Sequence, residues 1–159
     1  MKIFRKKILL QKNILEEKDL SFVPTLGGLH KGHAKLIKIA KSRFKRVIVS
    51  IYVNPKQFNS KKDFKKYPRK LKKDIALLKK IKVDYLYLPN YSDIFSFKTK
   101  NKIYLHPFSK KLCGKYRRNH FKGVINVVNR FLEIIKPKYI LLGKKDFQQV
   151  FLIKKHIEK

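Results

Sequence analysis

The sequence predicts an α/β protein with a parallel sheet, and two patterns lead to this class. From Phe22 onward, short runs rich in β-branched residues alternate with longer segments of helical periodicity. This alternation is typical of strands joined by crossover helices. The run Val47–Val49 is apolar at every position, as expected for a strand covered on both faces. With 159 residues, of which 43% are hydrophobic, the chain is expected to form a single domain over residues 1–159.

The expected elements follow in chain order. Strands are expected at Phe22–Pro24, Val47–Val53, Asp84–Leu88 and Tyr139–Leu142. Helices are expected at His33–Arg43, Asp63–Lys80, Lys122–Ile135 and Asp146–His156. A short strand at Ile3–Phe4 and a helix through Ile8–Ile14 are expected before them. The alternation around Ile103–Pro107 predicts a small β excursion within Ile94–Phe108.

Charge is the unusual feature of the composition. Lys and Arg number 42 against 10 Asp and Glu, a formal net charge of +32, and 35 of the 42 are Lys. The lysines are scattered over the whole chain, whereas recognition of bases and phosphates favours Arg. We interpret the charge as a general preference for Lys at solvated positions. Nonspecific binding to polyanions at low salt follows, with no specific nucleic-acid partner.

Cysteine content and apolar runs indicate the environment. Cys113 is the only cysteine, which excludes an intramolecular disulfide and fits a reducing, cytoplasmic location. The longest apolar run, Val47–Val53, is far shorter than the roughly 20 residues of a membrane helix. The N-terminus lacks the apolar segment of a signal peptide. We expect a soluble protein with no membrane partner.

The most informative segment runs from Pro24 to His33, directly after the first buried strand. Its glycines allow the backbone to approach a ligand, and the N-terminus of the following helix favours phosphate. His30 and His33 fall on one helix face, so both imidazoles can contact one anion. A solvated turn is the alternative, and zinc is disfavoured because no third ligand is near in sequence. The expected nucleotide contacts are Leu26, Gly27, Gly28, Leu29, His30, Lys31, Gly32 and His33.

Four ordered blocks resemble a known family. The His-x-Gly-His motif after a first strand is similar to the HIGH motif of Rossmann-like nucleotidyltransferases, and the string Phe22–His33 resembles the pantoate-beta-alanine ligase (pantothenate synthetase) family. Three further blocks are similar to the same family: Val49–Phe58, followed by Asp63-Phe64 and Tyr67-Pro68-Arg69; His120–Val124; and Gly143–Gln149. The resemblance implies a Rossmann-like parallel sheet, here incomplete at its C-terminal edge.

The resemblance also implies a reaction. Family members activate pantoate with Mg-ATP, release pyrophosphate and form a pantoyl-adenylate. The amine of beta-alanine attacks this adenylate to give AMP and pantothenate, a coenzyme A precursor. ATP, Mg²⁺, pantoate and beta-alanine are thus the implied cofactors and partners, with Mg²⁺ not held by protein ligands alone. The family's homodimer is a further expectation.

Site residues carry over from the matching motifs. His30, His33 and Lys145 are the implied catalytic residues, all on the ATP phosphates, with His33 as proton donor. A second nucleotide loop is implied at Gly143, Lys144, Lys145 and Asp146. Gln57 and Gln149 are the implied ligands of pantoate, with Gln57 also near beta-alanine. Both follow predicted strands at the carboxyl end, where open α/β sheets bind ligands.

Weaker candidates match the same motifs. Tyr67 and Arg69 are interpreted as residues that pack a helix against the site, and Asn54-Pro55 as a turn that aims Gln57. We interpret His120 as structural rather than catalytic.

The chain also departs from the family. Asn119 replaces the usual Gly before His120, and because Asn tolerates positive φ we expect this turn to survive. Leu26 replaces Met, a mild apolar exchange. Family members continue beyond the segment that matches Lys159 with a C-terminal lid domain, which we expect to be absent here. A catalytically weak remnant is therefore the alternative prediction, and a basic nucleic-acid-binding module is the third.

Overall fold

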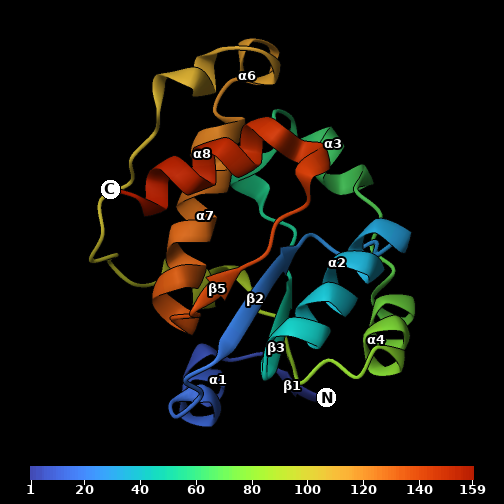
Figure 1. Cartoon of the computed structure of the whole chain (residues 1–159). Coiled ribbons are helices and arrows are strands. Elements are labelled where there is room, and N and C mark those ends of the chain that lie inside the picture. Colours follow the sequence, from blue (N-terminus) through green and yellow to red (C-terminus); the bar gives the residue numbers. More distant parts are fainter.

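A five-stranded parallel sheet forms the centre of the computed structural model, which describes residues 1–159 (Figure 1). The strands are β1 Lys2–Phe4, β2 Leu20–Thr25, β3 Arg46–Ile51, β4 Tyr85–Tyr87 and β5 Tyr139–Ile140. Their order is β1-β4-β3-β2-β5, and every neighbouring pair is parallel. The predicted fold class is therefore confirmed, although β4 and β5 are shorter than expected.

Helices cover both faces of this sheet. The α-helices are α1 Lys7–Ile14, α2 Lys31–Arg43, α3 Lys61–Lys66, α4 Leu71–Lys80, α5 Tyr91–Phe95, α6 Cys113–Tyr116, α7 His120–Ile135 and α8 Phe147–Ile157. Three 3₁₀ turns are η1 Pro55–Gln57, η2 Pro107–Lys110 and η3 Lys144–Asp146. Figure 1 shows α2 and α4 on one side of the sheet and α1, α7 and α8 on the other.

Alternate residues of each strand enter two separate cores. Phe22 of β2 and Ile48 of β3 pack with α1, α7 and α8 in the larger core. Val23 and Val49 point the other way and pack with α2 and α4 in the smaller core. This two-sided burial is what the apolar run in β3 predicts. It anchors β2 and β3, whose carboxyl ends carry the loops described below.

The predicted helix Asp63–Lys80 is wrong as a single element. Two helices, α3 and α4, occupy the stretch and are separated by residues 67–70. Pro68 disfavours helical backbone at Tyr67, whose φ of −60° and ψ of 129° lie outside the helical region. Arg69 then donates to the carbonyls of Phe64, Lys65 and Tyr67 at the end of α3. The Tyr-Pro-Arg motif therefore ends one helix before the next begins.

The predicted β excursion within Ile94–Phe108 is also wrong. The stretch contains the end of α5 and the start of η2, with no strand between them. Glu133 of α7 accepts from the backbone amides of Lys100 and Asn101, at 3.1 and 3.0 Å. Because a helix side chain satisfies these amides, they need no partner strand.

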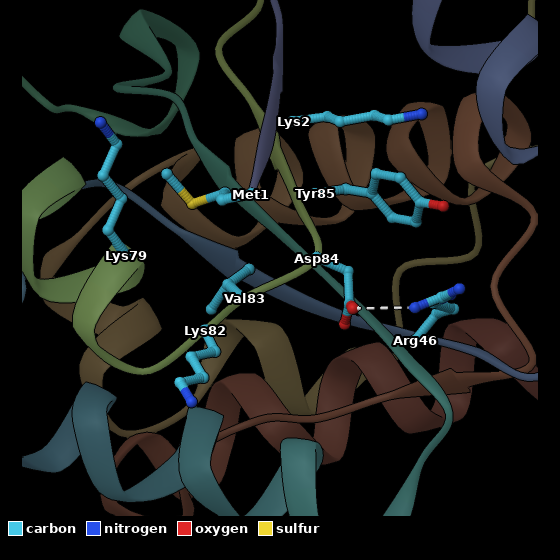
Figure 2. Close-up of a pocket in the computed structure, with 8 residues that line it drawn as sticks. All are labelled: Met1, Lys2, Arg46, Lys79, Lys82, Val83, Asp84 and Tyr85. Carbon is cyan, nitrogen blue, oxygen red and sulfur yellow. Dashed lines mark hydrogen bonds and ion pairs between the residues drawn. The ribbon is translucent and has the colours of Figure 1, made fainter.

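Asp84 joins the amino ends of β3 and β4. Its carboxylate accepts from Nζ of Lys41 at 2.7 Å, from the amide of Val47 at 2.9 Å and from Nη1 of Arg46 at 3.3 Å. Figure 2 shows the contact with Arg46. Burial alone would raise the pKa of Asp84, but its hydrogen bonds with Lys41 and Val47 bring the pKa below its usual value. At the amino ends of β3 and β4, the chain is therefore held together by ion pairs of Asp84 with Lys41 and Arg46.

Candidate active site

The loop after β2 begins with a fixed turn at Thr25. The Thr25 hydroxyl donates to the carbonyl of Ser50 at 2.7 Å and accepts from the amide of Gly27 at 3.2 Å. Gly27 and Gly28 then take φ values of +82° and +63°. These values lie in the left-handed region, which glycine adopts without strain. The sequence-predicted glycine loop is therefore a sharp turn that leads the chain from β2 to α2.

His30 and His33 stand side by side at the start of α2. Their ring centroids are 4.2 Å apart, as the spacing of three residues predicts. Nδ1 of His30 accepts from the amide of Gly32 at 3.1 Å, and Nδ1 of His33 accepts from the amide of His30 at 3.4 Å. With Nδ1 acting as acceptor, the proton of each neutral imidazole sits on Nε2. Both histidines can therefore donate from Nε2 to a bound anion.

The protonation of His33 follows from its surroundings. Burial lowers the pKa of His33 most, and the neighbouring His30 lowers it further. The negative charges of Asp74 and Asp146 act in the opposite direction. The net result is a pKa below the usual value, so His33 is neutral at pH 7. Asp146 lies in η3, directly after β5.

Gln57 is held in the turn η1 after β3. Its side chain is 7% exposed, and its Oε1 lies 3.4 Å from Nδ2 of Asn54. Nδ2 of Asn54 also donates to the carbonyl of Gly123 in α7 at 3.1 Å. The turn formed by Asn54 and Pro55 thus holds Gln57, as the sequence predicts. Nε2 of Gln57 has no hydrogen-bond partner in the chain and is available to a ligand.

His120 begins α7 and lies against the same turn. Its Nδ1 is 2.7 Å from the backbone carbonyl of Gln57, so Nδ1 carries the proton and donates. Burial lowers the pKa of His120 below its usual value, while the Gln57 carbonyl and the charge of Asp146 oppose this effect. The contact with Gln57 agrees with the structural role that the sequence analysis assigns to His120.

The loop after β5 contains the second set of predicted residues. Gly143, Lys144, Lys145 and Asp146 are all exposed, and neither lysine forms an ion pair. Gln149 is half-buried in the first turn of α8 and its side chain makes no hydrogen bond within the chain. No hydrogen bond joins Lys145 or Gln149 directly to the histidines. Lys145 and Gln149 are positioned at the carboxyl end of the sheet by β5 and α8.

The neighbouring Gln148 has a different role. It is buried, and its Nε2 donates to the carbonyls of Phe108 and Lys111 at 2.9 and 2.7 Å. Its Oε1 accepts from the amide of Cys113 at 3.1 Å. Every polar atom of this side chain is thus used to hold the segment around η2. Of the two adjacent glutamines, only Gln149 is free to meet a ligand.

Comparison with known proteins decides the family. The family model described as pantoate-beta-alanine ligase matches residues 2–159. This chain belongs to the pantoate-beta-alanine ligase family. It is 42% identical over 146 residues to the pantothenate synthetase of Thermosipho melanesiensis, and 42% identical over 152 residues to that of Francisella tularensis subsp. novicida. These alignments cover 92% and 94% of this chain but 52% and 58% of the relatives, so the chain spans about half the length of the curated relatives it matches.

Solved structures of ligases from this family share the fold. The crystal structure of the Francisella tularensis pantoate-beta-alanine ligase, complexed with beta-gamma ATP and beta-alanine, matches with a TM-score of 0.93 and 40% identity. The match covers 99% of this chain and 62% of that one. Pantothenate synthetase from Thermus thermophilus matches with a TM-score of 0.91 and 32% identity, over 99% of this chain and 57% of that one. The Rossmann-like arrangement is therefore that of the ligase family.

The departure from the ligase family at Asn119 preserves the turn. Asn119 takes φ of +62° and ψ of −4°, a left-handed conformation directly before α7. The expectation that Asn replaces Gly here without loss of the turn is confirmed. Because Asn119 sets the start of α7, it also sets the position of His120 against Gln57.

Asp74 is the site residue that sequence reasoning missed. Its carboxylate accepts from the amides of Gly28 and Leu29, at 2.9 and 2.8 Å, and its side chain is buried. A signal was present in the helical spacing, because Asp74 falls on the same helix face as Leu71 and Leu78. An acidic residue on an apolar face of a lysine-rich helix indicates a specific buried partner.

Other sites are not supported. No group of three or more His, Cys, Asp or Glu side chains gathers to hold a metal ion. No helix of the chain has the length and apolar character needed to cross a membrane. A cavity of about 500 Å³ lies at the amino ends of the strands, where Arg46 and Asp84 line it, and neither His30 nor His33 does. Figure 2 shows Lys2, Lys79 and Lys82 extending in different directions around it, so they do not converge on one ligand.

Proposed function

We propose that this chain carries the ATP and pantoate site of an ATP-dependent ligase. The ligase condenses pantoate with beta-alanine through a pantoyl-adenylate and releases AMP and pyrophosphate. Membership of the ligase family supports the proposal. The Francisella tularensis relative is described in complex with beta-gamma ATP and beta-alanine, which are the nucleotide and amine that this reaction requires.

One observation carries the proposal: three loops that are distant in sequence follow adjacent parallel strands at the carboxyl end of the sheet. The charge of Asp146, after β5, acts on both His33, after β2, and His120. His120 in turn holds the backbone of Gln57, after β3. These loops follow adjacent strands in the order β3-β2-β5. From β2 the chain continues to β3 and β4 on one side and then crosses to β5 on the other side of β2. Open α/β sheets bind ligands at such a switch in strand order.

The first chemical step transfers the adenylyl group to pantoate. A carboxylate oxygen of pantoate bonds to the α-phosphorus of ATP, and the bond from that phosphorus to the bridging oxygen of pyrophosphate breaks. Negative charge builds on the phosphate oxygens during this step. His30 and His33 donate from Nε2 to these oxygens, and Lys145 supplies a point charge. Because backbone amides already orient both imidazoles, little reorganisation is needed as the charge develops.

Two neutral amides are proposed to orient pantoate. Nε2 of Gln57 is free while its Oε1 contacts Asn54, so Gln57 can donate to the carboxylate or hydroxyl of the acid. The half-buried amide of Gln149 can both donate and accept. Because these amides are neutral, they hold the hydroxy acid without an ion pair, which would stabilise the bound substrate as strongly as the transition state.

The proposal includes the expectations that accompany the reaction. Mg²⁺ enters with the triphosphate and neutralises phosphate charge; the chain offers no cluster of side chains that would bind it alone. Beta-alanine attacks the adenylate from the side of Gln57. The homodimer and the cytoplasmic location belong to the same proposal. The first is implied by the family resemblance, and the second fits the single cysteine.

The proposal is tested by pantoate-dependent exchange of labelled pyrophosphate into ATP, with Mg²⁺ and enough salt to suppress aggregation. Exchange isolates adenylation from the attack by the amine. We expect exchange that requires pantoate and falls about 100-fold or more in His33→Ala, the usual effect of removing one preorganised donor. ATP binding is measured in parallel by calorimetry.

His106→Ala is the matched control, because the side chain of His106 accepts from the amide of Phe108 and packs against aromatic neighbours, away from His30 and His33. Exchange in this control should equal that of the unmodified chain. A folded chain that binds neither ATP nor pantoate would contradict the proposal. Equal exchange in His33→Ala would contradict the role of His33.

A further inference from the structure

We infer that Asp74 is a positioning residue for the phosphate-binding histidines. It acts through the backbone of Gly28 and Leu29 and does not contact the phosphates itself. The inference rests on the proposed function, because it assigns the loop between β2 and α2 to ATP. It adds a residue of α4 that lies outside the four sequence blocks of the family.

The geometry of this contact is bidentate. Oδ2 of Asp74 accepts from the amide of Gly28 at 2.9 Å, and Oδ1 accepts from the amide of Leu29 at 2.8 Å. Asp74 is 3% exposed, so water does not compete for these acceptors. Hydrogen bonds from amides to a buried carboxylate are among the strong ones in proteins. Two successive amides of a loop are thus tied to a single side chain of another helix.

The packing around the loop leaves little freedom. A Cβ atom on Gly27 would lie 3.0 Å from Cγ2 of Ile51 and 3.2 Å from Oδ2 of Asp74. Thr25 holds the amide of Gly27 from the other side. The loop is therefore clamped between the end of β3 and the first turn of α4.

The contact of Asp74 with the amides of Gly28 and Leu29, called the clamp below, determines which groups of the loop can bind a phosphate. A glycine-rich loop usually offers its own amides to the anion. Here the amides of Gly28 and Leu29 are already occupied by Asp74. Phosphate contacts from this segment must come from the imidazoles of His30 and His33 and from the first amides of α2. The loop therefore positions the two histidines, and their imidazoles donate the hydrogen bonds to phosphate.

The link from Asp74 to His30 is short. His30 directly follows Leu29 and accepts from the amide of Gly32 through its Nδ1. The two bonded amides belong to the peptide planes Gly27–Gly28 and Gly28–Leu29, so Asp74 fixes the backbone up to the residue before His30. The His30 amide in turn donates to Nδ1 of His33. Releasing the two loop amides would therefore disturb the tautomers of both imidazoles.

The test compares Asp74→Asn with Asp63→Asn in this same chain. Asn at position 74 keeps the shape but places an NH₂ group opposite one backbone amide, so one acceptor is lost. Asp63 is exposed on α3 and its carboxylate has no hydrogen-bond partner, so Asp63→Asn removes the same charge without breaking a contact. We expect ATP to bind Asp74→Asn about tenfold more weakly or worse, the usual effect of losing a hydrogen bond to a charged group. Asp63→Asn should bind as the unmodified chain does.

A spectroscopic readout separates positioning from simple loss of structure. Two-bond ¹H–¹⁵N spectra of the imidazoles report which nitrogen carries the proton. The unmodified chain should show the Nε2–H tautomer for His30 and His33, and Asp74→Asn should show mixed tautomers at these two residues while His156 stays unchanged. Unchanged tautomers and unchanged ATP affinity in a folded Asp74→Asn would overturn the inference.

A measurement on the unmodified chain covers the case in which Asp74→Asn does not fold. Hydrogen exchange should be slow at the loop amides of Gly28 and Leu29 and fast at the exposed amide of Lys31. Fast exchange at both loop amides would show that the clamp does not form. Failure of the unmodified chain to bind ATP would count against the proposed function, whereas slow loop exchange would still support the clamp.

Discussion

Gly27 is the residue on which the shape of the site depends most directly. Its φ of +82° and its close approach to Ile51 and Asp74 both exclude a side chain. The glycine that the sequence analysis assigned to ligand approach is thus also required by the protein's own packing. The same residue type at position 143 has open space around it and an ordinary φ of −75°.

We predict that Gly27→Ala is destabilising. Alanine in the left-handed region is strained, and its Cβ would press on β3 and on Asp74, so the free energy of unfolding should fall by about 1 to 3 kcal/mol. Gly143→Ala should change it by less than about 0.5 kcal/mol, as expected for an exposed position without contacts. Urea denaturation of the three proteins measures both effects. Equal midpoints for the two variants would contradict the prediction.

Among the elements, α7 does most to place the site. It packs on the larger core, and its first turn lies directly against η1. Gly123 makes this approach possible, because a Cβ there would lie 2.2 Å from the carbonyl oxygen of Lys56. Gly123 also accepts from Asn54 through its carbonyl. The helix backbone thus contacts the turn that carries Gln57.

We predict that Gly123→Ala separates α7 from η1. The new methyl group meets backbone rather than a flexible side chain, so the elements must move apart, with a loss of about 1 to 3 kcal/mol in the free energy of unfolding. Pantoate-dependent exchange should fall with it, because Gln57 shifts. Lys122→Ala, at an exposed position of the same helix, is the control for both measurements. A Gly123→Ala protein with unchanged stability and exchange would refute the contact.

At the scale of the whole molecule, three buried or half-buried histidines tie stability to pH. Burial is the largest cause of the lowered pKa at His33, His120 and His156. His156 is 6% exposed; its Nδ1 accepts from the amide of Tyr104 and its Nε2 donates to Asn129. Each of these residues is held neutral in the folded chain.

We predict that stability falls as the pH drops below about 6.5, the usual histidine pKa. Between that value and the lowered pKa values of the folded chain, the unfolded state binds more protons, so protonation favours unfolding. Well above about pH 6.5 the histidines are neutral in both states and add no pH dependence. Urea unfolding from about pH 5 to about pH 8 measures the slope. In His156→Gln the free energy of unfolding should change less steeply with pH. An unchanged slope in that variant would contradict the contribution of His156.

The sequence by itself determined the fold class, the order of the main elements, the histidine pair and the turn at Asn119. These features depend on local causes: hydrophobic period, glycine and asparagine conformation, and residue spacing along one helix face. The family blocks extended this to Gln57, Gln149 and the loop at Gly143–Asp146, whose roles stay predictions. Pro68 was a local signal for the break between α3 and α4, although the sequence analysis expects one helix over Asp63–Lys80.

Only the tertiary structure decided how these parts meet. Asp74 is 45 residues from Leu29 in sequence, and His120 is 63 residues from Gln57. Within Ile94–Phe108, the amides of Lys100 and Asn101 bond to Glu133 and the amide of Tyr104 bonds to His156, both on distant helices, in place of a neighbouring strand. The use of the Gly28 and Leu29 amides by a carboxylate also depends on where α4 packs. Hydrogen bonds between distant segments leave no period in the sequence, so periodicity finds the elements and only packing reveals their partners.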